Sequence, residues 1–420
     1  MSITAEVDGS IRSVKNLYTN IDGTMRKIKN VYANTDGNIK KVFSASNGYV
    51  TYGVKISLST YNPSFAVAYT DDAVGMDAGS GLWDIMPIFS DIRPCVLKDG
   101  EVTTYLSKSN FQNKSNGAAI GITSILDGDV MIEFPIIGIK ISKWDGFLDV
   151  KITNDPNADG FSYAPFLRPN QEKRKLYIGA FLGCVEDGKL RSVSGKQPTR
   201  SQTIDAFYQY AAAKGDGYSL FSFYALTLLQ CLYLIRFKNL DSQTVCGYGA
   251  SNTNGGRYSS GNTKDKAMFY PGTDEAPQNK VFGIEDLWGN LKTYIDGIRS
   301  SGYNYVISKN HTNAESEEAD IYPSTFSSSS TSEEGGFGRF IADVCGTNEL
   351  GFLISNSDTK ATDSTLFCDA GSFYTDRIAI LGGGGSGAKK NGIFSLGISI
   401  KTIDNEYYPY SDTSARLMYL

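Results

Sequence analysis

The segment VFGIEDLWGNLKTYIDGI, residues 281–298, and the closing segment SARLMYL, residues 414–420, decide the fold of this chain. The first segment sets a tryptophan among glycines and short polar residues, in the order Gly283, Asp286, Leu287, Trp288, Gly289 and Asn290. Before it the sequence predicts a strand pair, two helices and a loop-rich region, and after it a set of strands. This order indicates a β-rich α+β protein.

Local signals place these elements. Alternation of apolar and polar residues predicts strands at residues 53–59, 129–144 and 147–153. An Asp-Gly pair at Asp187 and Gly188 predicts a hairpin turn. The first helix is expected to begin near Thr199 and Ser201 and to end at Gly215, and the second to span residues 218–237.

The Trp288 segment fits the pattern G-[IL]-x-[DN]-[LMF]-x-G-N and resembles the formylglycine-generating-enzyme branch of the C-type lectin fold. That fold serves enzymes, phage tail-tip adhesins and hypervariable binding proteins. The segments KLRSVSGKQPT (189–199) and KNLDSQ (238–243), with the closing strand, resemble more particularly the C-terminal adhesin domains of tail proteins from phages and prophages of gut Firmicutes. This resemblance covers roughly residues 50–420.

A 14-residue repeat occupies residues 7–43, with Asp-Gly pairs at 8–9, 22–23 and 36–37. Each unit is expected to form a strand or hairpin that must stack on its neighbours, another copy or a partner. Residues 1–47 carry seven Lys and Arg against four Asp and Glu, a charge of +3 on a chain of net charge -5. The repeat resembles the N-terminal attachment segments of phage tail and baseplate proteins.

Length and composition fit a soluble protein of more than one domain. The mild charge of -5 argues against a nucleic-acid partner. No signal peptide or membrane span is recognised, and the apolar stretch at residues 220–237 is expected to be a buried helix. The expected domains are a repeat module at 1–47, a β-rich middle domain at 48–160 and a C-type lectin-like domain at 161–420.

The residues available for catalysis are few. His311 is the only histidine and is expected at the surface of a polar loop. The six cysteines have no CxxC spacing, which indicates reduced, mostly buried thiols, although one disulfide between Cys345 and Cys368 stays open. The oxidases of the resembled fold use a cysteine pair in the last core strands, and these two cysteines lie outside them. We therefore expect no enzyme activity, no metal and no cofactor.

The segment LGGGGSGAKKNGIF, residues 381–394, resembles the GG-x-W-x-x-G-x-x-x-G-x-F core of tail adhesins and retroelement-diversified variable lectins, with Gly385 in place of the tryptophan and Ala388 in place of a glycine. In those relatives, side chains between framework positions contact the ligand. Carried over to this chain, the ligand-binding candidates are Asn356, Asp358, Lys360, Phe373, Tyr374, Ser386, Lys389, Lys390, Asn391, Tyr407, Tyr408 and Tyr410.

Together these resemblances imply a phage tail-tip receptor-binding protein, expected to be made in the cytoplasm of a bacterial host and carried on the virion tail. Its expected partners are a host cell-surface glycan or protein, tail or baseplate proteins bound through residues 1–47, and two further copies in a homotrimer. Alternatives are a bacterial or injection-apparatus adhesin of the same fold, a formylglycine-generating-type oxidase, and a purely structural tail protein.

Overall fold

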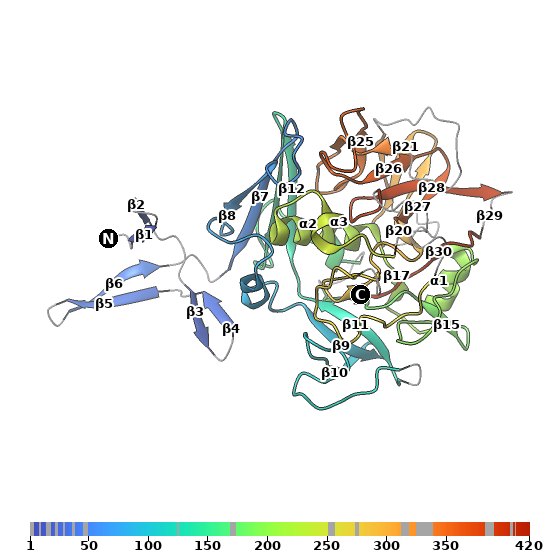
Figure 1. Ribbon diagram of the computed structural model, residues 1–420, viewed down its shortest axis with the longest axis horizontal. Coiled ribbons are helices and arrows are strands. Elements are labelled where there is room, and N and C mark those ends of the chain that lie inside the picture. Colours follow the sequence, from blue (N-terminus) through green and yellow to red (C-terminus); the bar gives the residue numbers. More distant parts are fainter. Residues whose placement is uncertain are drawn as a thin grey trace.

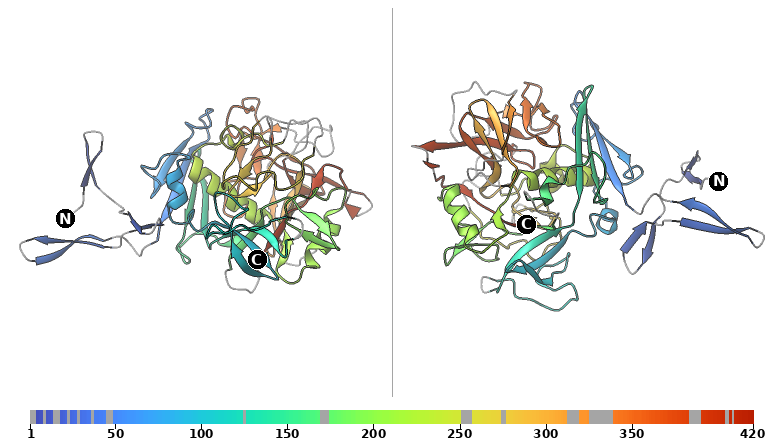
Figure 2. Two further views of the ribbon diagram at one scale, coloured as in Figure 1. Left: turned by 60° about the horizontal axis from the view of Figure 1, so that its bottom comes forward. Right: turned by 180° about the vertical axis from the view of Figure 1, so that it is seen from behind.

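The computed structural model describes residues 4–7, 10–13, 18–21, 24–27, 30–35, 38–44, 49–123, 126–168, 174–250, 257–273, 277–311, 319–324, 339–382, 390–403, 406–407 and 409–420. About 36% of the chain is strand and 12% is helix, which confirms the predicted β-rich α+β class. A body of packed sheets and helices begins near residue 49, and three hairpins lie outside it at its N-terminal side (Figure 1). Further views show the same separation (Figure 2).

Each N-terminal repeat forms a hairpin, as the Asp-Gly pairs predicted. In each hairpin the strands that flank the pair are antiparallel, and they form a two-stranded sheet of their own. The three pairs are β1 (Thr4–Val7) with β2 (Ser10–Ser13), β3 (Tyr18–Ile21) with β4 (Thr24–Lys27), and β5 (Asn30–Thr35) with β6 (Asn38–Ser44).

A six-stranded antiparallel sheet joins distant parts of the chain in the order β10-β9-β11-β14-β31-β17. Because β11 pairs with β14, the sheet crosses the border expected between residues 160 and 161. The expectation of a separate domain at 48–160 is therefore wrong, and one hydrophobic core runs from Val50 to Leu420. The strands are β9 (Arg93–Lys98), β10 (Glu101–Tyr105), β11 (Asp129–Phe134), β14 (Leu176–Gly179), β17 (Tyr218–Leu220) and β31 (Leu417–Tyr419).

A four-stranded antiparallel sheet has the order β12-β13-β7-β8. The predicted strand at 129–144 is divided between this sheet and the previous one, and Pro135, which lacks a backbone N–H, lies at the break. The predicted strand at 147–153 is confirmed. The strands are β7 (Thr51–Ser57), β8 (Val67–Asp71), β12 (Gly138–Trp144) and β13 (Phe147–Thr153).

The third large sheet carries most of the C-terminal strands, with the path β22-β21-β20-β27-β28-β26-β23 and with β29 and β30 attached. Its strands are β20 (Lys292–Ser301), β21 (Asn304–Ser308), β22 (Ala319–Pro323), β23 (Arg339–Phe340), β26 (Ala370–Phe373), β27 (Arg377–Leu381), β28 (Leu396–Ile403), β29 (Glu406–Tyr407) and β30 (Thr413–Ser414). Two-stranded sheets are β15 (Cys184–Glu186) with β16 (Lys189–Arg191), β18 (Lys280–Val281) with β19 (Ile284–Glu285), and β24 (Asp343–Val344) with β25 (Ile354–Asn356).

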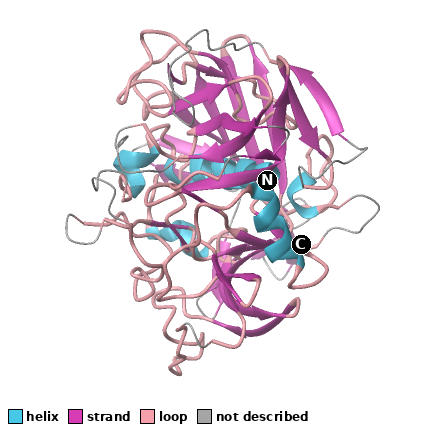
Figure 3. Ribbon diagram, turned by 90° about the vertical axis from the view of Figure 1, so that its right-hand side faces the viewer, coloured by secondary structure: helices cyan, strands magenta, loops and turns pink. Residues whose placement is uncertain are grey.

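The helices lie between groups of strands (Figure 3). The described residues form α1 (Ile204–Ala212), α2 (Phe223–Phe237) and α3 (Ser242–Cys246), with short 3-10 turns η1 (Gly81–Ile85) and η2 (Ala164–Phe166). Helix α2 packs against β7, β13 and β20, and all its residues up to Arg236 are buried, as expected for this apolar stretch. It begins five residues later than predicted because Ser222 caps it and residues 218–220 form β17.

The Trp288 segment lies in the core. The Trp288 side chain is buried, and its indole Nε1 donates to the carbonyl of Gly247 at 3.0 Å. Gly289 has φ 86°, and a Cβ there would lie 2.6 Å from the backbone nitrogen of Ala250, so only glycine fits. Buried Arg416 donates to the carbonyls of Glu285, Asp286 and Gly179 at 2.8, 2.9 and 2.9 Å. Arg416 thus connects the closing segment, residues 414–420, to the Trp288 segment, residues 281–298.

Candidate functional site

Four of the predicted ligand-binding residues lie around a small apolar cluster. This satellite cluster consists of Ala342, Ala361 and Leu366, with Phe340 packed against it. Lys360 adjoins Ala361 in the chain, and the Lys390 Nζ lies 5.7 Å from the Phe340 ring centroid. Asn356 reaches the same place because its carbonyl accepts a hydrogen bond from the Ala342 N–H at 3.0 Å. We call the exposed residues around the cluster the loop surface.

The loop surface contains a second pairing of a cation with an aromatic ring. Lys360 Nζ lies 5.7 Å from the ring centroid of Tyr61, and a hydrogen bond to Tyr61 raises the pKa of this lysine. Tyr61 is 45% exposed, so its ring is open to a ligand. The backbone carbonyl of Tyr61 accepts from the Leu366 N–H at 2.8 Å, which fixes this loop beside the satellite cluster.

Asp358 supplies the negative charge of the loop surface. Its side chain is exposed and accepts from the Lys360 N–H at 3.0 Å and from the Thr359 hydroxyl at 3.2 Å. The backbone hydrogen bond from Lys360 lowers the pKa of this carboxyl. The loop surface therefore combines two ammonium groups, one carboxylate, the Asn356 amide and two aromatic rings, a set that suits a polar ligand with ring or sugar units.

Two predicted ligand-binding residues are buried, which corrects their assignment to the surface. Phe373 is 2% exposed, because its ring packs against Tyr305 at a centroid distance of 4.9 Å inside the third sheet. Asn391 is also 2% exposed. It precedes the turn that buried Asp369 holds by accepting from the N–H groups of Gly392 and Phe394 at 2.7 and 2.9 Å. Both side chains therefore lie in the interior and do not face a ligand.

The remaining candidates do not join the loop surface. Half-buried Tyr374 lies at the end of β26, where its carbonyl accepts from the Ser300 hydroxyl at 2.6 Å. Tyr410 packs beside α1 in a different cluster, and its carbonyl accepts from the Ser201 N–H. Tyr407 lies on β29, of which the structure describes the backbone alone. Ser386, Lys389 and Tyr408 lie outside the described residues.

Sequence reasoning missed Tyr61 and Phe340. Tyr61 belongs to the stretch that was assigned to a middle domain, and no local pattern links it to residues 300 positions later. Phe340 follows shortly after the serine-rich sequence TFSSSSTSEEGG, residues 325–336, and has no periodic signal of its own. A search for exposed aromatic residues in loops would have identified Tyr61 as a candidate, but the sequence does not indicate its partner Lys360.

His311 is fully buried, so the expectation of a surface position is wrong. Its Nδ1 lies 2.9 Å from the Ser222 hydroxyl, and its Nε2 lies 2.8 Å from the carbonyls of Ala164 and Leu167. Because carbonyl oxygens only accept, Nε2 carries the proton and Nδ1 accepts from Ser222. Burial lowers the pKa of His311 to about 4. This serine–histidine pair caps α2 and is closed to substrate.

The cysteines and the grouping of possible metal ligands can be followed among the described residues. All six cysteines are free thiols, and burial raises the pKa of Cys345 to about 11 and that of Cys368 further, so neither is an activated thiolate. Among the described residues, no three or more His, Cys, Asp or Glu side chains are grouped as metal ligands would be. Within the same residues, no helix is long and apolar enough to cross a membrane.

Neither the models of known protein families nor the curated protein sequences give a match to this chain.

Proposed function

We propose that this protein is a receptor-binding protein of a phage tail, in which the loop surface recognises a ligand on the host cell and the N-terminal hairpins attach the protein to the tail. The proposal includes the C-type lectin-like fold that the Trp288 segment resembles. It assigns a binding function and no catalytic step.

The observation that carries the proposal is that charged and aromatic side chains from distant parts of the chain come together at the loop surface. Exposed Asp358 and Lys360 share one loop and exposed Lys390 comes from another, yet all three lie around one apolar cluster with Tyr61 beside them. Such a surface offers flat ring faces for stacking and charged groups for hydrogen bonds, and the rigid core below keeps them in place.

The hairpins support the attachment half of the proposal. None of the described strands β1–β6 pairs with a strand of the body, so the repeats do not complete its sheets. A two-stranded hairpin of four to seven residues per strand is marginally stable alone and gains stability by packing on a partner. The opposite charge of residues 1–47 and of the chain as a whole fits a docking element.

The test is binding of labelled full-length protein to a panel of gut Firmicute cells. We expect strain-selective binding that falls at least tenfold in the double variant Lys360→Ala and Lys390→Ala, because both cation–ring pairs are lost. A matched control removes two lysines from other parts of the surface, Lys114→Ala and Lys189→Ala, and should bind like the parent.

Binding that is equal in both double variants would place the receptor site elsewhere on the body. Failure to bind any strain on the panel, in protein that is folded by circular dichroism, would favour a purely structural tail protein.

A further inference from the structure

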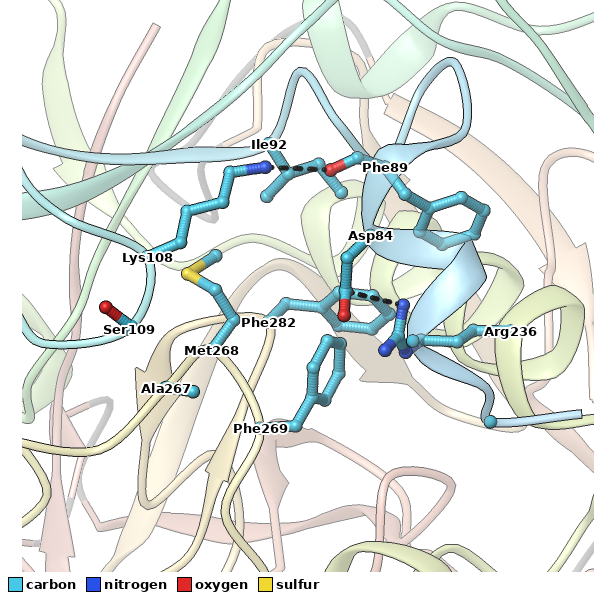
Figure 4. A pocket seen from close by; sticks show the side chains of 12 residues that line it. Asp84, Phe89, Ile92, Lys108, Ser109, Arg236, Ala267, Met268, Phe269 and Phe282 are labelled. Atoms are coloured by element: carbon cyan, nitrogen blue, oxygen red, sulfur yellow. Dashed lines mark hydrogen bonds and ion pairs between the residues drawn. The ribbon is translucent and has the colours of Figure 1, made fainter. Parts of the chain in front are cut away.

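A pocket of about 410 Å³ lies between η1, the start of β9 and the C-terminal end of α2. This volume is within the usual range for small-molecule sites. Its walls are mainly apolar and include Phe89, Met268, Phe269 and Phe282 (Figure 4). The pocket shares no residue with the loop surface.

Two cationic side chains and one carboxylate line this pocket. Arg236 lies at the end of α2, with a side chain only 4% exposed, and its Nη1 forms an ion pair with Asp84 Oδ1 at 2.8 Å. The guanidinium carbon lies 4.1 Å from the ring centroid of Phe269. Lys108 enters from another loop, and its Nζ donates to the carbonyls of Ser90 and Phe89 at 2.8 and 3.3 Å.

These cations have donor capacity that the described residues do not use. The Nε–H of Arg236 is buried and has no hydrogen-bond acceptor among them. An ammonium group has three N–H donors, and Lys108 places two of them on carbonyl oxygens. Asp84 is 49% exposed, so its carboxylate stays partly hydrated and offsets only part of the positive charge that lines the pocket. A buried N–H without an acceptor is unfavourable and is rare unless a ligand or water supplies one.

From this geometry we infer that the pocket binds a small organic anion, a carboxylate or phosphate carried on an apolar or ring-shaped body. The anionic oxygens would accept charge-assisted hydrogen bonds from the guanidinium of Arg236 and from Lys108 Nζ, since both side chains line the pocket. The body would lie on the apolar wall, where Phe269 meets Phe282 edge to face at 5.0 Å and Phe89 stacks on Phe282 at 6.5 Å.

The backbone around the pocket holds it open. The Gly79 N–H donates to the carbonyl of Arg236 at 2.8 Å, which ties the loop before η1 to the end of α2. Trp83 is fully buried beneath η1, and its indole donates to the carbonyl of Asp77 at 3.0 Å. These two contacts do not involve the guanidinium or the ammonium group, so they are retained when either cation is changed.

The experiment is calorimetric titration of the full-length protein with phenyl phosphate, benzoate and phenol. We expect saturable one-to-one binding of at least one of the two anions, at least tenfold tighter than binding of phenol, which has the same ring without the anionic group. Comparison of phosphate with carboxylate then distinguishes the two head groups. Arg236→Met and Lys108→Met should each weaken binding of the anion at least tenfold, and Lys189→Ala should not.

Arg236 is buried, so its variant is interpreted only if its thermal unfolding remains cooperative, and Lys108→Met, in a half-buried loop position, tests the same inference independently. Equal affinity for phenol would overturn the anionic assignment and leave an apolar pocket. Absence of binding by all three probes, or binding unchanged in both variants, would overturn the inference as a whole.

Discussion

His311 shows how a single side chain can couple the fold to pH. Its neutral ring receives a hydrogen bond from Ser222, the N-cap of α2, and holds η2 through two carbonyls. Protonation would place a charge among backbone groups, and no described carboxylate is a hydrogen-bond partner of the ring. The cause of the lowered pKa is therefore burial, and the native state binds the proton more weakly than the unfolded chain.

We predict that His311 makes stability decrease as the pH falls. The contribution is complete above the unfolded pKa near 6.5 and is lost progressively toward a folded pKa of about 4, because the unfolded state takes up the proton first. At pH 5 this group should contribute about 2 kcal/mol less stability than at pH 7. The measurement is urea unfolding of the parent and of His311→Gln at both pH values.

The variant is needed because Asp369, whose pKa burial raises to about 7, changes stability in the opposite direction over this range. NMR gives a direct check, since the chain has one histidine. An imidazole signal that titrates near pH 6.5 would show that the ring is solvated.

Lysine should not be able to replace Arg416. Its fixed planar group reaches three carbonyls on two elements, and the single ammonium of a lysine cannot do so. We predict that Arg416→Lys lowers the free energy of unfolding by about 2–4 kcal/mol, since buried carbonyls lose their donors. Arg339→Lys, at an exposed position, should lie within about 0.5 kcal/mol of the parent in the same denaturant titration.

At the scale of elements, Gly188 in the turn of the β15–β16 hairpin allows the free-energy cost of a left-handed backbone conformation to be measured by itself. Gly188 has φ 71°, and a Cβ there would meet no atom within 4 Å. We predict that Gly188→Ala destabilises the protein by about 1–2 kcal/mol through left-handed strain alone. Gly121 is equally uncrowded but has no positive φ, so Gly121→Ala should be neutral or slightly stabilising. Similar changes in melting temperature for both would contradict this explanation.

Elements with local signals were predictable from the sequence. The Asp187-Gly188 turn, β13 and the existence of α1 and α2 follow from turn residues, alternation and apolar patterning, which act within a few positions. The predicted caps Thr199 and Ser201 are wrong, because Thr203 caps α1 by accepting from the Ala206 N–H, and the helix ends at Ala212 before the predicted Gly215. The start of α2 was misplaced because residues 218–220 are apolar and fit either a helix or a buried strand. Contacts between distant residues, such as Tyr61 with Lys360, have no local signal, so only part of the candidate site could be predicted.

At the scale of the whole molecule, the repeat module and the body should be separable. Among the residues whose burial is described, the core begins at Val50, and the described strands of the module pair only among themselves. We predict that deletion of residues 1–47 changes the melting temperature of the body by less than about 2 °C, which corresponds to less than 1 kcal/mol. Calorimetry of the two proteins measures this difference.

The same deletion tests assembly. If the repeats hold copies together, light scattering should show the homotrimer expected from the sequence resemblance for the full-length protein and a smaller species after deletion. A large fall in melting temperature would mean instead that the hairpins pack on the body.

The position of β31 has a consequence for synthesis. This strand lies between β14 and β17 inside the six-stranded sheet, although about 200 residues separate it from β17 and more from β14. Residues 417–419 must therefore leave the ribosome before the sheet can form completely. Until then, β14 and β17 each have an edge without its partner strand. A copy terminated early by a nonsense codon would lack a central strand, so it should be degraded and never join an assembly as a partly working subunit.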